Sequence, residues 1–273
     1  KATSCRFKSG SGHHYEILVL RSTMKKKQDQ KQLFLIGPPR SGTTILTQVL
    51  NTSKYILLTD ELRVNAWLIR EMKKINEGHE VHGDPYPFNK GSRFALYLQR
   101  KSNAFIEQFY NKLAQEEQKE EFIYWGDKYP HYDRYLKKFP RLFPDSLYIG
   151  IFRNISEVIN SVMVGHKWEF KKSMDYCKRI YKSYIDQLVF LDEKAVFIFD
   201  YSQLKAEDPL EEISKMFTFL NIEIEENQKN VIKSTLSYQS HSTRKADNVG
   251  KKFSANKSRY ILTSKELEVI ESD

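Results

Sequence analysis

The stretch from Leu33 to Thr44, which reads LFLIGPPRSGTT, constrains the fold more than any other part of the chain. The apolar run Leu33–Ile36 is typical of a strand that is buried on both faces of a parallel sheet. Gly37 and Gly42 then allow a tight turn, and the polar residues that follow begin a helix. Backbone N–H groups and the dipole at such a helix start attract anions. The stretch therefore predicts a strand, a phosphate-binding loop and a helix in succession.

Short apolar runs recur along the chain with helical patterns between them, which is the alternation that βαβ units produce. The runs that predict strands are Leu33–Ile36, Phe122–Trp125, Leu147–Phe152 and Ala195–Phe199. Apolar residues at helical spacing predict helices over Ile45–Leu50, Leu62–Ile75, Phe94–Gln118, Ile155–Val164, Met174–Leu191 and Leu210–Leu220. We therefore expect an α/β fold in which helices flank a central parallel sheet.

The domain organisation follows from composition along the 273 residues of the chain. Residues 1–30 are polar and basic apart from Tyr15–Leu20, which predicts an edge strand, so we expect a polar lead-in and then a single domain over residues 31–273. Residues 77–92 are rich in glycine and proline and predict a loop that rims a pocket. No apolar stretch approaches the ~20 residues of a membrane-spanning helix, so we expect no membrane span.

The phosphate loop departs from that of nucleotide triphosphatases at one position. The Gly-x-x-x-x-Gly spacing matches, but Thr43 follows the second glycine where those proteins carry lysine. Kinases and ATPases use that lysine with Mg²⁺ to offset the charge of a γ-phosphate, whereas a sulfuryl group in transfer carries less negative charge. Arg40 with the hydroxyls of Ser41, Thr43 and Thr44 would then be enough to stabilise the transferring group without a metal ion. The loop favours sulfuryl transfer, and a P-loop nucleotide kinase or other phosphotransferase is the alternative.

A second phosphate site is predicted at the end of Leu147–Phe152. Arg153 follows this strand directly, and Ser161 lies eight residues later in the next predicted helix. Two helical turns bring the serine above the helix start, so a guanidinium and a hydroxyl can converge on one phosphate. The ends of parallel strands are where α/β sheets bind nucleotides, so two such motifs indicate one nucleotide site.

The segment Pro39–Thr44 resembles the 5′-phosphosulfate loop of PAPS-dependent sulfotransferases (PAPS is 3′-phosphoadenosine 5′-phosphosulfate). The similar branch includes tyrosylprotein sulfotransferases and many bacterial members. Arg153 and Ser161 match the family's 3′-phosphate motif in spacing and position. The resemblance implies the sulfotransferase version of the P-loop-containing nucleotide-hydrolase fold, PAPS as co-substrate, PAP as product and no metal. Ser41, Gly42, Thr43 and Thr44 would bind the donor.

The resemblance also implies the catalytic residues. Lys128, in the stretch WGDKYP, matches the lysine that precedes a proline and reaches the transferring group. Glu61 lies 21 residues after Arg40, where the similar branch carries its catalytic glutamate, and Asp60 is the second candidate for the base. Arg63 would orient an acidic or extended acceptor. Arg40 and Lys128 would stabilise charge on the leaving phosphate oxygen.

Two further matches extend the resemblance from about Leu33 to Lys252. Tyr201 begins the segment Tyr-Ser-Gln-Leu, where the family has Tyr-Glu-Asp-Leu, and would lie against the adenine. The two missing acids leave any other role of that segment open. Lys251 lies in RKADNVGKK, which is similar to the basic glycine-containing loop that closes over PAPS.

Charge and composition limit the classes of partner, metal site and cellular compartment that we expect. A net charge of +9 suits a polyanionic partner, including nucleic acid, but the sequence has no RNA- or DNA-binding motif, so we expect no nucleic-acid partner. Cys5 and Cys177 lack the spacing of metal ligands, so we predict no metal site. Asn154 lies in a glycosylation sequon inside the predicted nucleotide site, where a glycan would block binding. This predicts a cytoplasmic enzyme, with the Golgi lumen as the alternative.

The sequence thus predicts in-line transfer of a sulfuryl group from PAPS to an acceptor hydroxyl, with Glu61 as general base. The acceptor hydroxyl can belong to a peptide tyrosine, a glycan, a lipid or a small metabolite, because variable loops build the acceptor pocket.

Overall fold

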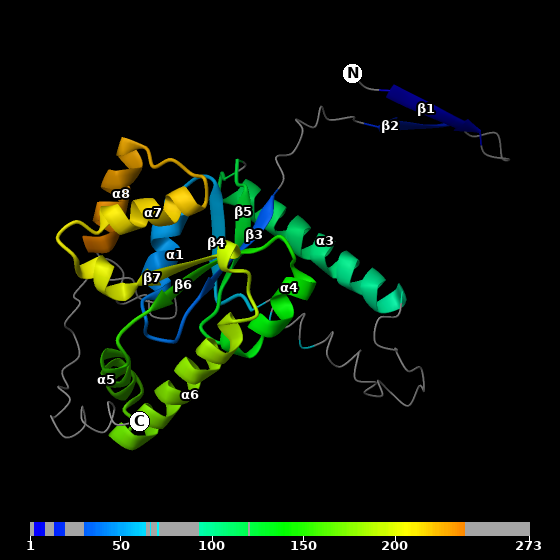
Figure 1. Ribbon diagram of the computed structural model, residues 1–273. Coiled ribbons are helices and arrows are strands. Elements are labelled where there is room, and N and C mark those ends of the chain that lie inside the picture. The colour runs from blue at the N-terminus through cyan, green and yellow to red at the C-terminus, as the bar shows by residue number, and fades with distance from the viewer. Residues whose placement is uncertain are drawn as a thin grey trace, which may run out of the picture. The chain divides into compact units, whose positions relative to one another are not determined.

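The computed structural model describes residues 3–8, 14–19, 30–63, 66, 70, 93–119 and 121–237. The chain divides into two compact units, Lys1–Gln30 and Lys31–Asp273. In the first unit, strand β1 (Thr3–Lys8) pairs antiparallel with strand β2 (His14–Val19). The edge strand expected at Tyr15–Leu20 thus corresponds to β2. The second unit holds the central sheet and the described segments in which the sequence analysis predicts phosphate binding (Figure 1).

Five parallel strands form the central sheet in the order β4-β5-β3-β6-β7. Their bounds are β3 Lys31–Ile36, β4 Ile56–Asp60, β5 Tyr124–Lys128, β6 Leu147–Phe152 and β7 Val196–Asp200. The four predicted strands are confirmed, with β5 shifted towards Lys128. The sequence analysis missed β4, whose apolar part is only three residues long. The α/β fold with a central parallel sheet is therefore confirmed.

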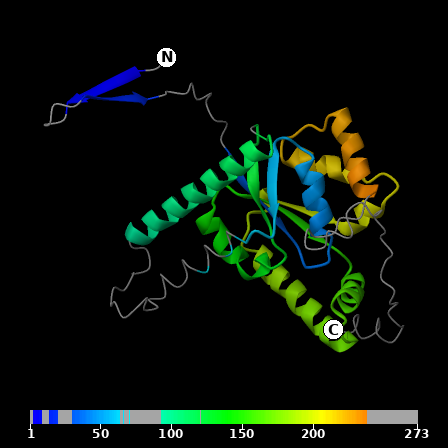
Figure 2. The ribbon, with the colours of Figure 1, turned by 180° about the vertical axis from the view of Figure 1, so that it is seen from behind.

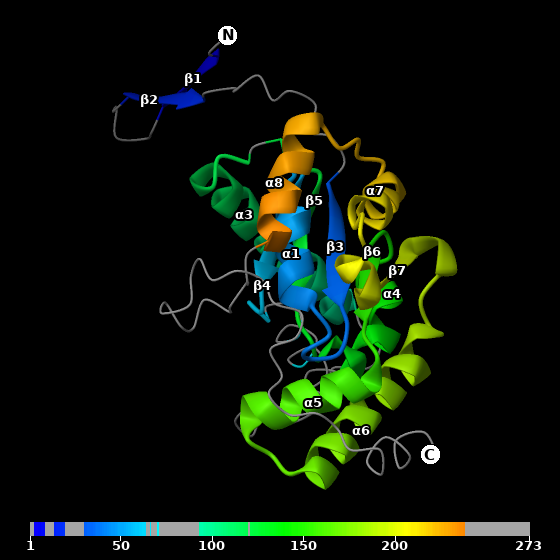
Figure 3. The ribbon, with the colours of Figure 1, turned by 90° about the vertical axis from the view of Figure 1, so that its left-hand side faces the viewer.

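Helices cover both faces of this sheet. Their bounds are α1 Thr43–Asn51, α3 Arg93–Glu116, α4 Phe139–Leu142, α5 Ile155–His166, α6 Phe170–Leu188, α7 Leu210–Phe219 and α8 Glu226–Ser237, with short 3₁₀ turns η1 Tyr132–Arg134, η2 Leu136–Lys138, η3 Glu193–Ala195 and η4 Tyr201–Lys205. Figure 2 shows α1 and α3 on opposite sides of the sheet, and Figure 3 shows α1 and α8 together on its near side. None of the described helices is long and apolar enough to cross a membrane.

The central strand β3 supplies side chains to two hydrophobic cores, because neighbouring residues in a strand point to opposite faces. Leu33 and Leu35 pack in the core that contains α1, α7 and α8. Phe34 and Ile36 pack in the core that contains α3, α4 and α6. All four side chains are fully buried, which explains why β3 is a continuous apolar run. The strand is therefore held rigidly on both sides where it delivers the phosphate loop.

The described helices confirm most of the predicted ones. Helix α6 begins four residues before its expected start at Met174, and α8 was missed. The predicted helix Leu62–Ile75 lies outside the described residues except at its first two positions and at Ala66 and Arg70, which are helical. The predicted loop 77–92 also lies outside the described residues.

Candidate functional site

The candidate site lies where the five parallel strands end. Parallel strands deliver their carboxyl ends to one edge of the sheet, and that edge is where open α/β sheets bind ligands. Each of the five strands ends at, or one residue before, a residue that the sequence analysis named. These residues are Gly37 after β3, Asp60 in β4, Lys128 in β5, Arg153 after β6 and Tyr201 after β7.

The phosphate loop has a backbone that depends on glycine. Gly37 has φ +151°, and a Cβ atom there would lie 2.2 Å from the carbonyl oxygen of Ile151 on the neighbouring strand. Gly42 has φ +98°, and its Cβ would lie 2.5 Å from the ring of Tyr201. The backbone of Arg40 is also in the left-handed region, with φ 70°. The glycines adopt these angles without strain, whereas the left-handed backbone of Arg40 is unfavourable and persists because its surroundings hold it, as is common at functional sites.

The start of helix α1 fits an anion. Gly42 is the N-cap residue, and no described side chain caps the first turn. The hydroxyl of Ser41 is fully buried and donates instead to the carbonyl of Pro38 at 2.6 Å, so it stabilises the shape of the loop. The amides of the first turn are thus left for a ligand, since helix starts carry N–H groups without an intrahelical partner.

Lys128 brings three predicted residues together beside this loop. Its side chain is only 1% exposed, and its ammonium forms ion pairs with Asp60 and with Glu61 Oε1, the latter at 3.2 Å. It also donates a hydrogen bond to Thr44 Oγ1 at 3.3 Å. A buried ammonium requires such partners, because an unpaired charge in the interior is strongly unfavourable. Lys128, the two candidate bases and the phosphate loop therefore form one cluster of contacts.

Glu61 is held at both ends of its carboxylate. Lys128 contacts Oε1, and Arg63 donates to Oε2 at 3.2 Å. Partial burial raises the pKa of Glu61, but the charges and hydrogen bonds of Lys128 and Arg63 outweigh burial and lower it below its usual range. Glu61 and Arg63 both have left-handed backbones, with φ 56° and 62°. The carboxylate is therefore ionised at neutral pH and fixed in orientation.

Asp127 anchors the turn that carries Glu61, and the sequence analysis missed it. It is fully buried and accepts hydrogen bonds from the amides of Leu62 at 3.1 Å and Arg63 at 3.0 Å. It also accepts from the hydroxyls of Thr59 at 3.1 Å and Tyr132 at 3.0 Å. Burial raises the pKa of Asp127 to about 6. An acid inside a buried strand was the available signal, because such residues are rarely buried without a role.

Arg40 and Arg153, which the sequence analysis assigned to one predicted nucleotide site, lie next to each other. A guanidinium nitrogen of Arg153 lies 3.4 Å from the carbonyl oxygen of Arg40. Arg40 Nε donates to Ser161 Oγ at 3.0 Å, so in this structure Ser161 pairs with Arg40 and not with Arg153. Burial, followed by the charge of Arg153, lowers the pKa of Arg40. Two guanidinium groups that repel each other in this way are suited to a bound anion.

A carboxylate and an aromatic ring position Arg153. Glu157 Oε2 accepts from Arg153 Nε at 2.5 Å and also pairs with Lys205 Nζ at 3.0 Å. The guanidinium of Arg153 lies 4.4 Å from the centre of the Tyr201 ring. That ring is only 5% exposed and packs against Gly42, so it links the phosphate loop to Arg153. Contact of Tyr201 with adenine stays a prediction, and Lys251 lies outside the described residues.

Two tyrosines of α6, which the sequence analysis also missed, form hydrogen bonds with the backbone just after the strand ends. The Tyr184 hydroxyl accepts from the amide of Gly37 at 3.1 Å and lies 3.0 Å from the carbonyl of Pro130. The Tyr181 hydroxyl donates to the carbonyl of Arg153 at 2.5 Å. These bonds join three strand ends to one helix.

Among the described residues, no group of three or more His, Cys, Asp and Glu side chains could hold a metal ion.

Comparison with known proteins gives a consistent result. The model of the sulfotransferase family matches residues 32–226. The sulfotransferase domain of the Synechococcus PCC 7002 olefin synthase resembles the chain with a TM-score of 0.53 and 16% identity, covering 92% of this chain and 97% of that one. Mouse sulfotransferase SULT7A1 complexed with PAP has a TM-score of 0.52 and 15% identity, and the likeness covers 98% of this chain and 91% of that one.

Sulfotransferase STF9 from Mycobacterium avium has a TM-score of 0.50 and 14% identity, covering 89% of this chain and 76% of that one. At these identities the likenesses show a shared fold. No curated protein sequence matches the chain.

Proposed function

The chain belongs to the sulfotransferase family, and from this we propose that it transfers a sulfuryl group from PAPS to a hydroxyl group of an acceptor. The observation that carries the proposal is the contact between Arg40 and Arg153 next to the cluster of Lys128, Glu61 and Thr44. A cationic pair and an acid–base cluster thus adjoin one phosphate loop. The structure of SULT7A1, whose fold is shared, was determined with PAP, which supports this donor.

We assign the two ends of the donor to the two parts of the site. The uncapped start of α1, with Thr43 and Thr44, faces the 5′-phosphosulfate, since helix starts bind anions. Arg153 with Ser161 is assigned to the 3′-phosphate, and Arg40, which adjoins both residues, is assigned to the leaving phosphate oxygen. Charge-assisted bonds from a guanidinium to phosphate are among the strongest in proteins. Tyr201 and Lys251 are assigned to the adenosine side by resemblance.

The reaction follows from these positions. The acceptor oxygen attacks sulfur, the bond between sulfur and the 5′-phosphate oxygen breaks, and the acceptor proton passes to the carboxylate of Glu61. Lys128 and Arg40 stabilise the negative charge that develops on the leaving phosphate oxygen. Orientation of the two reactants and this electrostatic stabilisation supply most of the rate. The acceptor hydroxyl can belong to a peptide tyrosine, a glycan, a lipid or a small metabolite.

A binding test separates this proposal from a phosphotransferase. We expect PAP without Mg²⁺ to raise the melting temperature by roughly 5–10 °C at about 100 times its Kd, since a ligand that binds only the folded state stabilises it by ~2.7 kcal/mol there. Differential scanning fluorimetry with PAP and with Mg-ATP measures both. Stabilisation by Mg-ATP alone would contradict the proposal and favour a nucleotide kinase.

A further inference from the structure

Lys205 is the last residue of η4, the segment whose role beyond Tyr201 the sequence analysis left open. Its ammonium lies 3.0 Å from each carboxylate oxygen of Glu157 and 5.2 Å from the centre of the Tyr201 ring. The side chain is 28% exposed, so these contacts are partly shielded from water. Lys205 thus reaches the surroundings of Arg153 from a different strand end, that of β7.

Glu157 is shared between Lys205 and Arg153. Arg153 Nε donates to Glu157 Oε2 at 2.5 Å, and Lys205 Nζ donates to the same oxygen at 3.0 Å. Burial by itself would raise the pKa of Glu157, but the hydrogen bonds and charges of Arg153 and Lys205 outweigh burial and lower it. At neutral pH one ionised carboxylate therefore lies between two cations.

The contact with Glu157 orients Arg153 through one nitrogen only. Among the described residues, the two terminal nitrogens of the guanidinium have one hydrogen-bond partner, the carbonyl oxygen of Arg40 at 3.4 Å. A guanidinium binds phosphate most strongly through two parallel N–H donors. Glu157 thus holds Arg153 in place and leaves donors available for a phosphate.

This orientation has an electrostatic disadvantage that Lys205 offsets. The pair of Arg153 and Glu157 has no net charge, and a carboxylate at hydrogen-bond distance weakens the attraction of the guanidinium for any other anion. Lys205 returns one positive charge to the group. A phosphate monoester carries about 1.5–2 negative charges at pH 7, so its binding responds to that charge.

We propose that Lys205 is a positioning residue through which the site selects nucleotides with a 3′-phosphate. Lys205 neutralises Glu157, so that Arg153 is oriented by a carboxylate and still has its charge for the phosphate. The inference rests on the proposed function, because it assigns Lys205 to the donor site of sulfuryl transfer. Lys205 acts through Glu157 and Arg153 and does not contact the phosphate itself.

The test uses two nucleotides that differ only in the 3′-phosphate. Isothermal titration calorimetry on the full chain gives the affinities for PAP and for 5′-AMP, and their ratio reports the contribution of the 3′-phosphate. The variants are Lys205→Gln, Lys205→Arg, and Lys205→Gln combined with Glu157→Gln. The amide that replaces the carboxylate of Glu157 can still accept from Arg153 Nε but has no charge.

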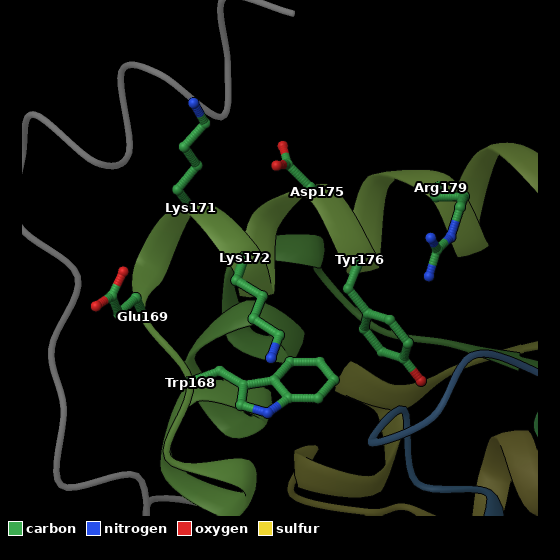
Figure 4. A pocket seen from close by; sticks show the side chains of 7 residues that line it. All are labelled: Trp168, Glu169, Lys171, Lys172, Asp175, Tyr176 and Arg179. Carbon is green, nitrogen blue, oxygen red and sulfur yellow. The ribbon is translucent and has the colours of Figure 1, made fainter.

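Two control variants remove a lysine charge elsewhere. Lys215→Gln removes a lysine of α7 that also pairs with carboxylates, Glu211 at 3.1 Å and Glu212 at 3.0 Å. Lys172→Gln removes a lysine that also lies over an aromatic ring, with its ammonium 4.2 Å from the centre of Trp168 in a pocket at the start of α6 (Figure 4). Both lysines lie outside the residues assigned to the donor, so we expect both variants to keep the wild-type affinities.

In Lys205→Gln we expect the affinity for PAP to fall about tenfold, because the pair that faces the phosphate is then neutral, while the affinity for 5′-AMP stays within about twofold. Lys205→Arg should keep PAP affinity within about threefold, since arginine also pairs with a carboxylate. The double variant should recover PAP affinity to within about threefold of the wild type, because Arg153 then has its charge without a neighbouring carboxylate.

Three results would overturn the inference. An equal loss for PAP and 5′-AMP in Lys205→Gln would mean that the lysine only supports the local fold. Unchanged PAP affinity in that variant would mean that Lys205 has no part in binding. A double variant as weak as Lys205→Gln would mean that the ammonium contacts the phosphate directly and does not act through Glu157.

The wild-type protein separates this inference from the proposed function. If it binds PAP more tightly than 5′-AMP and the Lys205 variants do so to the same extent, the donor assignment stands and the role of Lys205 is wrong. If it binds PAP no more tightly than 5′-AMP, the 3′-phosphate has no site, and the assignment of PAPS fails together with this inference.

Discussion

Glu61 carries the proposed base function on a left-handed backbone, and both of its carboxylate oxygens contact cations. Its lowered pKa means that the group is ionised at neutral pH, so it is ready to accept a proton. The same ion pairs weaken it as a base. Movement of the Lys128 ammonium towards the leaving phosphate oxygen would free Oε1 for the acceptor proton. The ion pair thus holds the carboxylate in position before the donor and acceptor arrive.

The first prediction compares Glu61 with its neighbour Asp60. Glu61→Gln should lower kcat by about a hundredfold or more, because a general base contributes that much, while PAP affinity changes little. Asp60→Asn is the matched control, since Asp60 pairs with the same ammonium and is similarly exposed. Sulfate transfer and PAP titration measure both variants. Wild-type turnover in Glu61→Gln, or a larger loss of kcat in Asp60→Asn, would assign the base elsewhere.

At the scale of the elements, the sheet was predictable and much of the site was not. The strands β3, β5, β6 and β7 are apolar runs, and parallel pairing brings their ends together, so contact between the segments of Arg40 and Arg153 followed from the pattern. Strand β4 was missed because Ile56–Leu58 is too short a run to distinguish from a loop. The hydrogen bonds of Asp127 and the pairing of Arg40 with Ser161 depend on side-chain rotamers, which no periodicity encodes.

The turn between β3 and α1 yields the second prediction. Gly42→Ala places a Cβ atom 2.5 Å from the Tyr201 ring at φ +98°, so the loop must shift. We expect a loss of about 1–3 kcal/mol in the free energy of unfolding and at least a tenfold loss of PAP affinity. Gly150→Ala is the control, because its Cβ meets the flexible end of Ile198 at 2.7 Å. Urea unfolding and PAP titration measure both. Equal PAP affinity in the two variants would contradict this role of Gly42.

At the scale of the whole molecule, the sheet separates two hydrophobic cores, and Asp127 places a carboxyl group in its interior. The pKa of this group links it to the stability of the fold, because burial raises that pKa from its ordinary value of 3.8 to about 6. Between these two values the folded state holds the proton and the unfolded state has released it. Stability from this group is therefore greatest at low pH and is lost as the pH rises through about 6.

The last prediction isolates this contribution with Asp127→Asn, since asparagine does not titrate. The difference in free energy of unfolding, wild type minus variant, should fall by about 2–3 kcal/mol between pH 4 and pH 7, because one pKa unit corresponds to ~1.4 kcal/mol. Taking the difference cancels Glu61 and Glu157, whose lowered pKa values stabilise the fold above their unfolded pKa and lose that effect as the pH falls. Urea unfolding at pH 4, 5, 6 and 7 measures the difference. If it is constant, or grows with pH, then the carboxyl of Asp127 is ionised throughout and its four hydrogen bonds outweigh its burial.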